Sequence, residues 1–378
     1  MAITVFVFRH SPKGWLSSVS PAISYVIDSP LSKILSSGQP FDALLHQSGS
    51  PYQLSTFRSK KIARLEVGNQ PREMTINRSL APMSRRDSLR TLALGAGTLA
   101  APQLLKAKGD LASNGLTLAV QQYSFNRQLT TGELNILDYP QTVVEGTGIT
   151  ALEYFNGHFQ DKSGNTRFFR ELKKRADNSG ATCTLMLCRS ENALDSSDSN
   201  VRYQSVEEHI PWLEAVRQLG GKAIRVDCRS SGDYEEQKNY AVDGLSQLSD
   251  VARPFGMNIL LENHGGFSGN GKWVADVMKR VNSSNCGTLP DFQNFADYEP
   301  YLGVKEMMPF AKIVCAKSKE FDADGNEVNV DYERMMKIVL DSGFRGFIGI
   351  EFEGHGVDPI EGILATKHLI ERVVAKLG

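Results

Sequence analysis

The chain has 378 residues, of which 41% are hydrophobic, and a formal net charge of -1. These values are ordinary for a globular protein and allow one large domain or two average ones. The charge is uneven, because residues 1–115 carry 14 Lys/Arg against 6 Asp/Glu, whereas residues 116–378 carry 28 against 37, a net of -9. An acidic folded region argues against tight nucleic-acid binding, which needs a basic surface for phosphate contacts.

The five cysteines form no Cys-x-x-Cys pair and are odd in number. The sequence therefore predicts neither a disulfide framework nor a zinc–thiolate cluster. We expect most of them to be small, buried hydrophobic residues.

An export-like signal lies within the N-terminal third. Residues 83–102 begin with the basic run Ser84-Arg85-Arg86, continue through a short apolar stretch and end in small residues. This is the layout of a secretory signal and resembles the twin-arginine type. The apolar stretch is too short and glycine-rich for a stable membrane span. We therefore expect a bacterial protein exported to the periplasm, with an ordinary amphipathic helix as the alternative for this stretch.

The residues on either side of this signal show little sign of regular structure. Residues 1–82 are rich in Ser, Pro, Gln and Arg and have no sustained hydrophobic periodicity. Because a signal belongs at an N-terminus, the simplest explanation is that translation begins at Met83. A real, mostly disordered extension is the alternative. Residues 103–115 are predicted to be a polar linker, and residues 116–378 to be the folded domain.

From Leu116 onward, eight apolar strand-like runs alternate with amphipathic helix-like stretches. Such alternation predicts a parallel sheet, and eight units in 263 residues fit a single-domain (β/α)8 TIM barrel. An open doubly wound sheet is the alternative, but no Gly-x-Gly-x-x-Gly follows the first run. The strand-like runs are 116–123, 149–155, 181–188, 223–227, 257–262, 286–291, 312–317 and 347–352. The helix-like stretches include 166–178, 205–219, 234–252, 273–281, 300–308, 332–340 and 358–376.

Three carboxylates, Glu262, Asp291 and Glu351, stand at the ends of three of these runs. Catalytic side chains of a TIM barrel lie at the carboxyl ends of its strands. Three carboxylates at one barrel mouth would repel each other unless a divalent cation or protons neutralised them. The pattern therefore predicts a metal-centred site, with exposed loop carboxylates as the alternative. Gly349, two residues before Glu351 on the same strand face, leaves space inside the barrel.

Other polar groups at or beyond the ends of the runs are candidates for substrate binding: Glu153, Arg225, Arg229, His264 and His355. The two arginines could clamp a substrate carboxylate or phosphate. Alternatively, they pair with Asp227, which lies between them. Each histidine follows a strand-end glutamate, although either could be an ordinary loop residue.

Four short motifs together resemble the xylose isomerase-like TIM-barrel superfamily: Glu262-Asn263-His264, Asp291, Ala316-Lys317-Ser318 and Glu351-Phe352-Glu353-Gly354. That group includes sugar isomerases, sugar and sugar-phosphate epimerases and AP endonuclease family 2. In its epimerase branch, a divalent ion is held by Glu, Asp, His and Glu on strands 5 to 8, and the two glutamates transfer the proton. The resemblance implies that Glu262, Asp291 and Glu351 bind the metal, and that Glu262 and Glu351 are catalytic.

The chain departs from this family pattern at two positions. Cys315 occupies the usual histidine position; a thiolate could bind zinc, whereas a buried thiol without such a metal is inert. Lys317 lies on the same strand face, and its ammonium could neutralise the carboxylates, so we count it as catalytic. Asn294 stands where epimerases often place a substrate-binding histidine, and we expect it to bind substrate. The resemblance thus implies a divalent ion, Mn, Mg, Zn or Co. Because Cys315 replaces the usual histidine ligand, the resemblance does not fix whether a metal binds or which one.

The leading functional prediction is an isomerase or epimerase that acts on a small-molecule sugar or sugar derivative through an enediolate. A lyase or dehydratase that shares the enolate intermediate is the nearest alternative, and a non-catalytic carbohydrate-binding barrel is another. A phosphodiesterase resembling endonuclease IV would need several histidines, and only five follow residue 116. We expect no nucleic-acid partner and no stable membrane span, and leave a homo-oligomer open.

Overall fold

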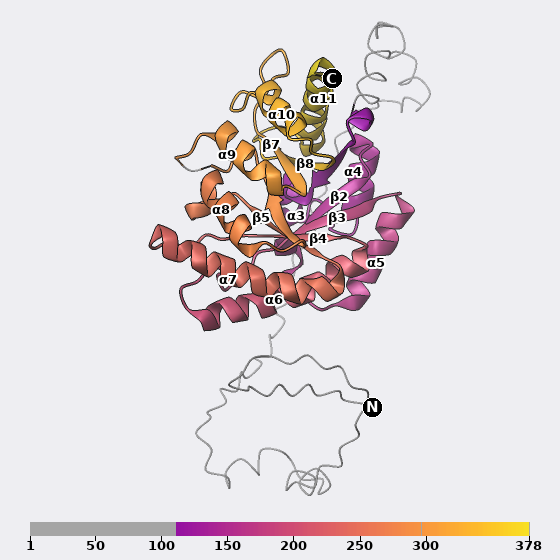
Figure 1. Ribbon diagram of the computed structural model, residues 1–378. Helices are drawn as coiled ribbons and strands as arrows, with labels where there is room; N and C mark the ends of the chain where they lie inside the picture. Colours follow the sequence, from indigo (N-terminus) through magenta and orange to yellow (C-terminus); the bar gives the residue numbers. More distant parts are fainter. Residues whose placement is uncertain (1–110, 296, 378) are drawn as a thin grey trace, which may run out of the picture. The chain divides into compact units, whose positions relative to one another are not determined.

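The computed structural model describes residues 111–295 and 297–377. The predicted extension 1–82, the predicted signal 83–102 and residues 103–110 of the predicted linker lie outside the described residues. Within the described part, eight parallel strands form a nearly closed barrel with helices between them (Figure 1). The prediction of a TIM barrel is therefore confirmed.

The strands pair in the order β6-β5-β4-β3-β2-β1-β8-β7, and every pair is parallel. The remaining seam, between β6 and β7, is joined by single bridges from Thr288 to Ala311 and from Asp291 to Cys315. The strands are β1 (Leu116–Gln121), β2 (Ala151–Phe155), β3 (Thr182–Leu187), β4 (Ala223–Val226), β5 (Asn258–Glu262), β6 (Cys286–Leu289), β7 (Ile313–Ser318) and β8 (Gly346–Phe352). Each lies within, or one residue beyond, a run that the sequence predicts.

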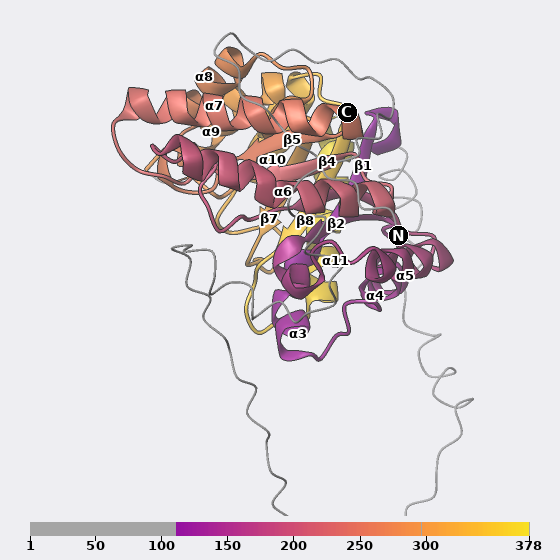
Figure 2. The same ribbon diagram turned by 90° about the horizontal axis from the view of Figure 1, so that it is seen from below.

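Helices α4 to α11 surround the strands in Figure 1, and neighbouring ones pack on one another all the way round, whereas the short α3 lies at one end of the barrel in Figure 2. The starts of α5 to α10 are capped by side chains, as where Asp233 accepts the backbone N–H groups of Glu235 and Glu236. Neither α3 nor α4 was predicted from the sequence; the nine residues of α4 include Pro140 and Gly146 and so carry a weak helical pattern. The helices are α3 (Asn126–Thr131), α4 (Tyr139–Thr147), α5 (Thr166–Asn178), α6 (Ser199–Leu219), α7 (Tyr234–Ala252), α8 (Gly271–Val281), α9 (Pro300–Met307), α10 (Tyr332–Asp341) and α11 (Pro359–Leu377).

Two hydrophobic clusters hold the barrel together. The larger one lies between the strands and the helices and includes Trp212 and Trp273, which are buried packing residues. The smaller one fills the inside of the barrel and contains Phe155, Leu185, Leu187, Ala223, Leu260, Leu289, Ile313 and Cys315. Because side chains alternate along a strand, the residues two positions beyond this inner layer reach the barrel mouth.

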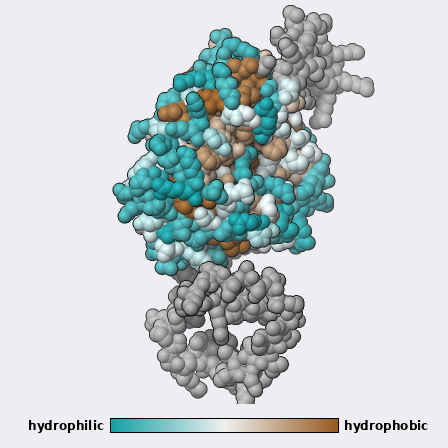
Figure 3. All heavy atoms as spheres, in the orientation of Figure 1, coloured by the Kyte–Doolittle hydropathy of each residue, from teal (hydrophilic) through white to brown (hydrophobic). Residues whose placement is uncertain are grey.

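The face of the barrel drawn in Figure 3 is mostly hydrophilic, with small separate hydrophobic patches. This agrees with outer helices whose apolar sides pack inward. Among the described residues, no helix is both long enough and apolar enough to cross a membrane.

Candidate active site

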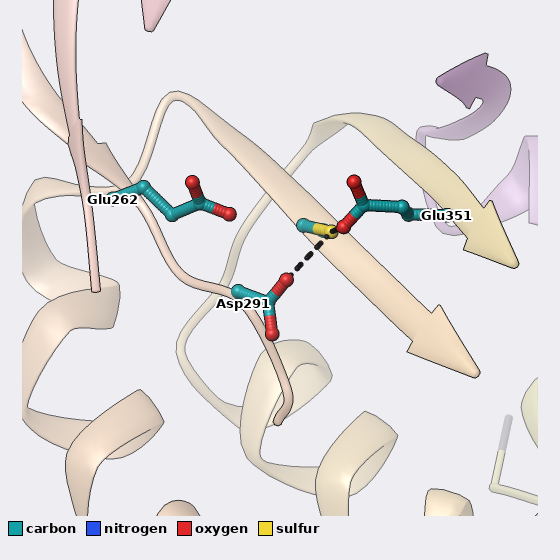
Figure 4. A group of neighbouring side chains, drawn as sticks. Glu262, Asp291 and Glu351 are labelled. Atoms are coloured by element: carbon teal, nitrogen blue, oxygen red, sulfur yellow. Dashed lines mark hydrogen bonds between the residues drawn. The ribbon is translucent and has the colours of Figure 1, made fainter. Parts of the chain in front are cut away.

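The three strand-end carboxylates meet at the mouth of the barrel. Glu262 ends β5, Asp291 follows β6, and Glu351 lies near the end of β8. Figure 4 shows the three side chains pointing toward one another. Ligand atoms of these residues and of Cys315 all lie within 4.8 Å of one another, and all four residues are buried. The barrel thus places side chains that are up to 89 positions apart in the sequence in one cluster.

Lys317 supplies a positive charge beside this cluster. Its Nζ lies 2.9 Å from Glu351 Oε2 and 3.4 Å from Asp291 Oδ2, and it donates a hydrogen bond to Asn294 Oδ1 at 3.0 Å. Burial acts to lower the pKa of Lys317, but the negative charges of Asp291 and Glu351 outweigh it and raise that pKa well above its ordinary value. The ammonium is therefore charged at neutral pH and partly neutralises the cluster.

A second internal cation, Arg225 on β4, pairs with Glu262. Its guanidinium contacts Glu262 Oε2 through both Nε and Nη2, and both side chains are almost completely buried. The second carboxylate oxygen of Glu262 accepts a weak hydrogen bond from Asn294 Nδ2 at 3.4 Å. Glu262 is therefore held as one half of a buried ion pair.

Asp291 is fixed by its own loop and by Cys315. Its Oδ1 accepts the backbone N–H groups of Gln293 at 2.7 Å and Asn294 at 2.9 Å. Its Oδ2 accepts a hydrogen bond from the Cys315 thiol at 3.1 Å, the dashed line in Figure 4. Burial, followed by the charges of Asp291 and Glu351, raises the pKa of the Cys315 thiol well above its ordinary value. Without a metal, Cys315 is thus a protonated hydrogen-bond donor.

Glu351 is the carboxylate of the cluster that lines the small cavity described below. Burial raises its pKa, and the positive charge of Lys317 opposes that shift.

Glu153 on β2 lies inside the barrel, where its carboxyl oxygens occupy the space that Gly349 leaves; a Cβ on Gly349 would lie 2.5 Å from Glu153 Oε2. Burial and the charge of Glu351 raise the pKa of Glu153 to about 8. Glu153 is therefore mostly protonated at neutral pH.

A small cavity of about 190 Å³ opens at the cluster. Its polar wall is formed by Arg189, Arg225, His264, Asn294, Lys317, Glu351 and Glu353, and its apolar wall by Tyr123, Phe155 and Leu187. The volume suits a single small molecule such as a monosaccharide. A larger crevice of about 650 Å³ lies between the loop after β7 and α11, but it contains none of the clustered carboxylates.

The predicted substrate-binding residues divide into two groups. Arg225, His264 and Asn294 line the cavity, whereas Glu153, Arg229 and His355 do not. Glu153 is fully buried, Arg229 is half-exposed beside Asp227, and His355 is exposed in the loop after β8. Burial, together with repulsion from Arg225, lowers the pKa of His264 to about 4, so its imidazole is neutral at neutral pH. The roles predicted for all these residues, and for the carboxylates, stay predictions.

The cavity is also lined by residues that were not predicted to belong to the site, among them Tyr123 and Arg189. Each lies two positions beyond the end of a strand, Tyr123 after β1 and Arg189 after β3. The alternation that places Leu187 inside the barrel would also have placed Arg189 at the mouth. The alternation of inward-facing and outward-facing residues, continued two positions past each strand end, would have identified both residues from the sequence.

The donor atoms at the cluster fit a divalent metal ion in type and spacing. Carboxylate oxygens bind hard ions such as Mg²⁺ and Mn²⁺, and a thiolate added to them favours Zn²⁺ or Co²⁺. Three carboxylates and a thiolate would carry four negative charges, and Lys317 and Arg225 already balance two of them. One divalent ion with Cys315 deprotonated would complete the neutralisation. The cluster could therefore hold such an ion.

The sequence and the fold both match known proteins. The family model described as "Xylose isomerase-like TIM barrel" matches residues 142–373, which is more than half of the chain. No curated protein matches the chain significantly.

Among solved structures, the IolI protein with a bound zinc atom has a TM-score of 0.56 and 18% identity, with 69% of this chain and 98% of that chain covered. The probable 3-DHS dehydratase AsbF from Bacillus anthracis has a TM-score of 0.54 and 16% identity, with coverage of 67% and 98%. The 3-keto-D-glucoside 4-epimerase YcjR from E. coli has a TM-score of 0.54 and 13% identity, with coverage of 68% and 99%. At such identities these likenesses establish the fold.

Proposed function

The chain belongs to the xylose isomerase-like TIM-barrel family, and from this premise we propose that it is an isomerase or epimerase acting on a sugar or sugar derivative. The observation that carries the proposal is the pair formed by Glu351 and Lys317 on the wall of the cavity. A carboxylate whose pKa is raised, beside an ammonium that stays charged, combines a base with an electrostatic stabiliser. Proton abstraction next to a carbonyl group needs both of these.

In the proposed reaction, Lys317 Nζ donates a hydrogen bond to the substrate carbonyl oxygen. Glu351 takes the proton from the neighbouring carbon, and the negative charge that develops on the carbonyl oxygen is stabilised by the ammonium. Glu262, across the cluster, takes up a proton from solvent and delivers it to the opposite face of the enediolate to give the isomer or epimer, while Glu351 releases the proton that it took to solvent. Asn294 holds Lys317 and also contacts Glu262, so it orients both groups.

Glu262, Asp291, Cys315 and Glu351 would hold a divalent ion. When bound, such an ion would supply Lewis-acid polarisation of the substrate carbonyl. Lys317 provides a positive charge at the same place from the chain itself, so the proton transfers above are assigned to protein side chains.

A lyase or dehydratase is the second candidate, because the probable 3-DHS dehydratase has a similar fold. It would use the same first proton abstraction and then expel a leaving group from the β-carbon. The candidate metal cluster contains no histidine among the described residues, which argues against an endonuclease IV-like phosphodiesterase with its several histidine ligands.

The proposal is tested by turnover in heavy water against a panel of ketoses, aldoses and keto-glycosides, with products read by NMR. An isomerase or epimerase places deuterium at the carbon next to the carbonyl and yields a product of unchanged mass apart from that label. Loss of water or another group would favour the lyase. Conversion without any exchange, unaffected by Glu351→Gln, would leave the proposal without a mechanism, and no conversion at all would favour a binding role. Metal content is measured in the same samples.

We also propose that residues 83–102 direct export. This segment, fused to a reporter enzyme in a bacterium with a twin-arginine pathway, should carry the reporter to the periplasm. Replacement of Arg85 and Arg86 by lysine should retain it in the cytoplasm, whereas replacement of Arg90 should not. Equal export of both variants would contradict the proposal.

A further inference from the structure

Three arginines converge on one carboxylate at the β3–β4 side of the barrel mouth. Asp227 Oδ2 lies 2.6 Å from Arg229 Nη2 and 3.8 Å from Arg189 Nε, and Asp227 Oδ1 lies 2.8 Å from Arg225 Nη1. The only other carboxylate paired with any of these arginines, among the described residues, is Glu262. Three positive charges therefore face two negative ones, and the group keeps an excess positive charge.

The ion pairs leave arginine donors unused. Within the described part of the chain, the Arg189 guanidinium makes no hydrogen bond, and its contact with Asp227 is too long for one. Arg225 is 2% exposed, yet its Nη1 has only an ion-pair contact with Asp227 and no partner in hydrogen-bond geometry. Arg189 and Arg225 both line the 190 Å³ cavity. Unused guanidinium donors at a cavity wall suit a planar or tetrahedral anion.

The backbone around the arginines is held in place by buried side chains. Asn156, which is 2% exposed, donates to the Arg189 carbonyl oxygen at 2.8 Å and accepts from the Arg189 N–H at 2.9 Å. Asp195, which is 1% exposed, accepts from Ser230 N at 2.9 Å and Ser230 Oγ at 2.8 Å, beside Arg229. The Arg189 guanidinium also lies over the Phe155 ring, 5.3 Å from its centroid. These contacts hold the backbone at Arg189 and beside Arg229, so the half-exposed side chains of the two arginines extend from fixed positions.

We propose that Arg189, Arg225 and Arg229 form a subsite for an anionic group of the substrate, either a carboxylate or a phosphate. The proposal rests on the proposed sugar isomerase or epimerase function and narrows its substrate to an acidic or phosphorylated monosaccharide derivative. The anion lies on the β3–β4 side of the cavity, and the reacting carbonyl lies beside Lys317 and Glu351 on β7 and β8. Asp227 occupies part of the subsite and competes with the substrate anion for the arginines.

The proposal predicts opposite effects for two substitutions. Arg189→Met removes donors and should weaken the binding of charged ligands. Asp227→Asn removes the competing carboxylate and should strengthen that binding, a gain that a purely structural ion pair would not give. A charge-assisted hydrogen bond changes affinity by about tenfold or more, and effects of that size are expected in both directions.

The test measures binding by calorimetry at low salt, with D-glucuronate, D-glucose 6-phosphate and inorganic phosphate as charged probes and D-glucose as the neutral one. At least one charged sugar should bind about tenfold or more tightly than D-glucose, and the preferred one identifies carboxylate or phosphate as the group. Arg189→Met should abolish this preference. Arg253→Met is the control and should keep the preference, because Arg253 is exposed and pairs with Asp250 away from the mouth. Thermal unfolding of each variant confirms that it is folded.

Absence of a charged-probe preference in the wild type, or its persistence in both Arg189→Met and Arg229→Met, would overturn the subsite. A failure of Asp227→Asn to tighten charged-probe binding would also count against it. Because the readout is binding, Glu351→Gln should retain the preference. A preference for anions without any hydrogen exchange in heavy water would therefore remove the isomerase proposal and leave the subsite standing.

Discussion

Lys317 Nζ lies 2.9 Å from Glu351 Oε2 because the two residues are register partners on the neighbouring strands β7 and β8. The pairing of β7 with β8 thus places the Lys317 ammonium beside the Glu351 carboxylate at the barrel mouth. Asp291 reaches the same ammonium across the incompletely closed seam between β6 and β7. The barrel's closure and the electrostatics of its site are consequences of the same strand arrangement.

Replacement of Lys317 by methionine should destabilise the fold. Asp291 and Glu351 would be left buried without this cation, and removal of one partner of a buried pair costs about 3–5 kcal/mol. Millimolar Mn²⁺ or Zn²⁺ should restore more stability to Lys317→Met than to the wild type, because a divalent ion supplies the missing charge. Urea unfolding with and without metal measures both effects.

Lys238→Met is the matched control for that substitution. Lys238 is also buried, but its partner Glu235 is largely exposed and can be solvated by water once the lysine is removed. Lys238→Met should therefore cost much less stability than Lys317→Met, and Mn²⁺ or Zn²⁺ should not restore the stability that is lost. Equal effects of the two substitutions would contradict the role assigned to Lys317.

Substitution of Glu262 and substitution of Glu351 should affect different steps, namely hydrogen exchange and product formation. Glu351 lines the cavity, whereas Glu262 is held by Arg225 and does not line it. Glu351→Gln should lower both hydrogen exchange and product formation by at least about 10²-fold, the usual scale of general acid-base assistance. Glu262→Gln should keep exchange through Glu351 and lose product formation. Loss of exchange in Glu262→Gln with metal occupancy unchanged would reverse the two assignments.

Much of this arrangement was predictable from the sequence, because it depends on local patterns. The alternating apolar runs predicted eight strands, and the position of Glu262, Asp291 and Glu351 at run ends predicted their convergence. The choice of ion-pair partner was not predictable, since Arg225 pairs with Glu262 only because β4 and β5 align Arg225 with Leu260. The contact between Glu153 and Gly349 likewise spans the intervening strand β1. Such pairings depend on register and tilt, which one strand's sequence does not encode.

Glu153 should make the stability of the barrel depend on pH. Its pKa is raised to about 8 in the folded chain, against an ordinary value of 4.5. The unfolded chain therefore releases this proton as the pH rises through about 4.5, while the folded chain retains it until about pH 8. The contribution of Glu153 to folding stability falls over that interval, by about 1.4 kcal/mol for each unit of pKa difference.

Glu153→Gln removes this titration and should be more stable than the wild type at pH 8, but close to it at pH 5. Chemical unfolding at a series of pH values measures the difference, and the exposed Glu361→Gln serves as the control. A difference between Glu153→Gln and the wild type that does not change with pH would contradict the raised pKa.

Cys315 should control how tightly the cluster binds a divalent ion. As a thiol whose pKa is raised, it has to lose a proton before it can bind a metal, and that cost weakens affinity. Cys315→His supplies a nitrogen donor that needs no such deprotonation at neutral pH, so Mn²⁺ affinity should rise about tenfold or more. Cys315→Ser is the control, because its hydroxyl is a poor metal donor. Electron paramagnetic resonance of free Mn²⁺ measures affinity directly, without turnover. A folded Cys315→His protein that binds Mn²⁺ no more tightly than the wild type would show that Lys317 and Arg225, rather than the fourth donor, limit metal binding here.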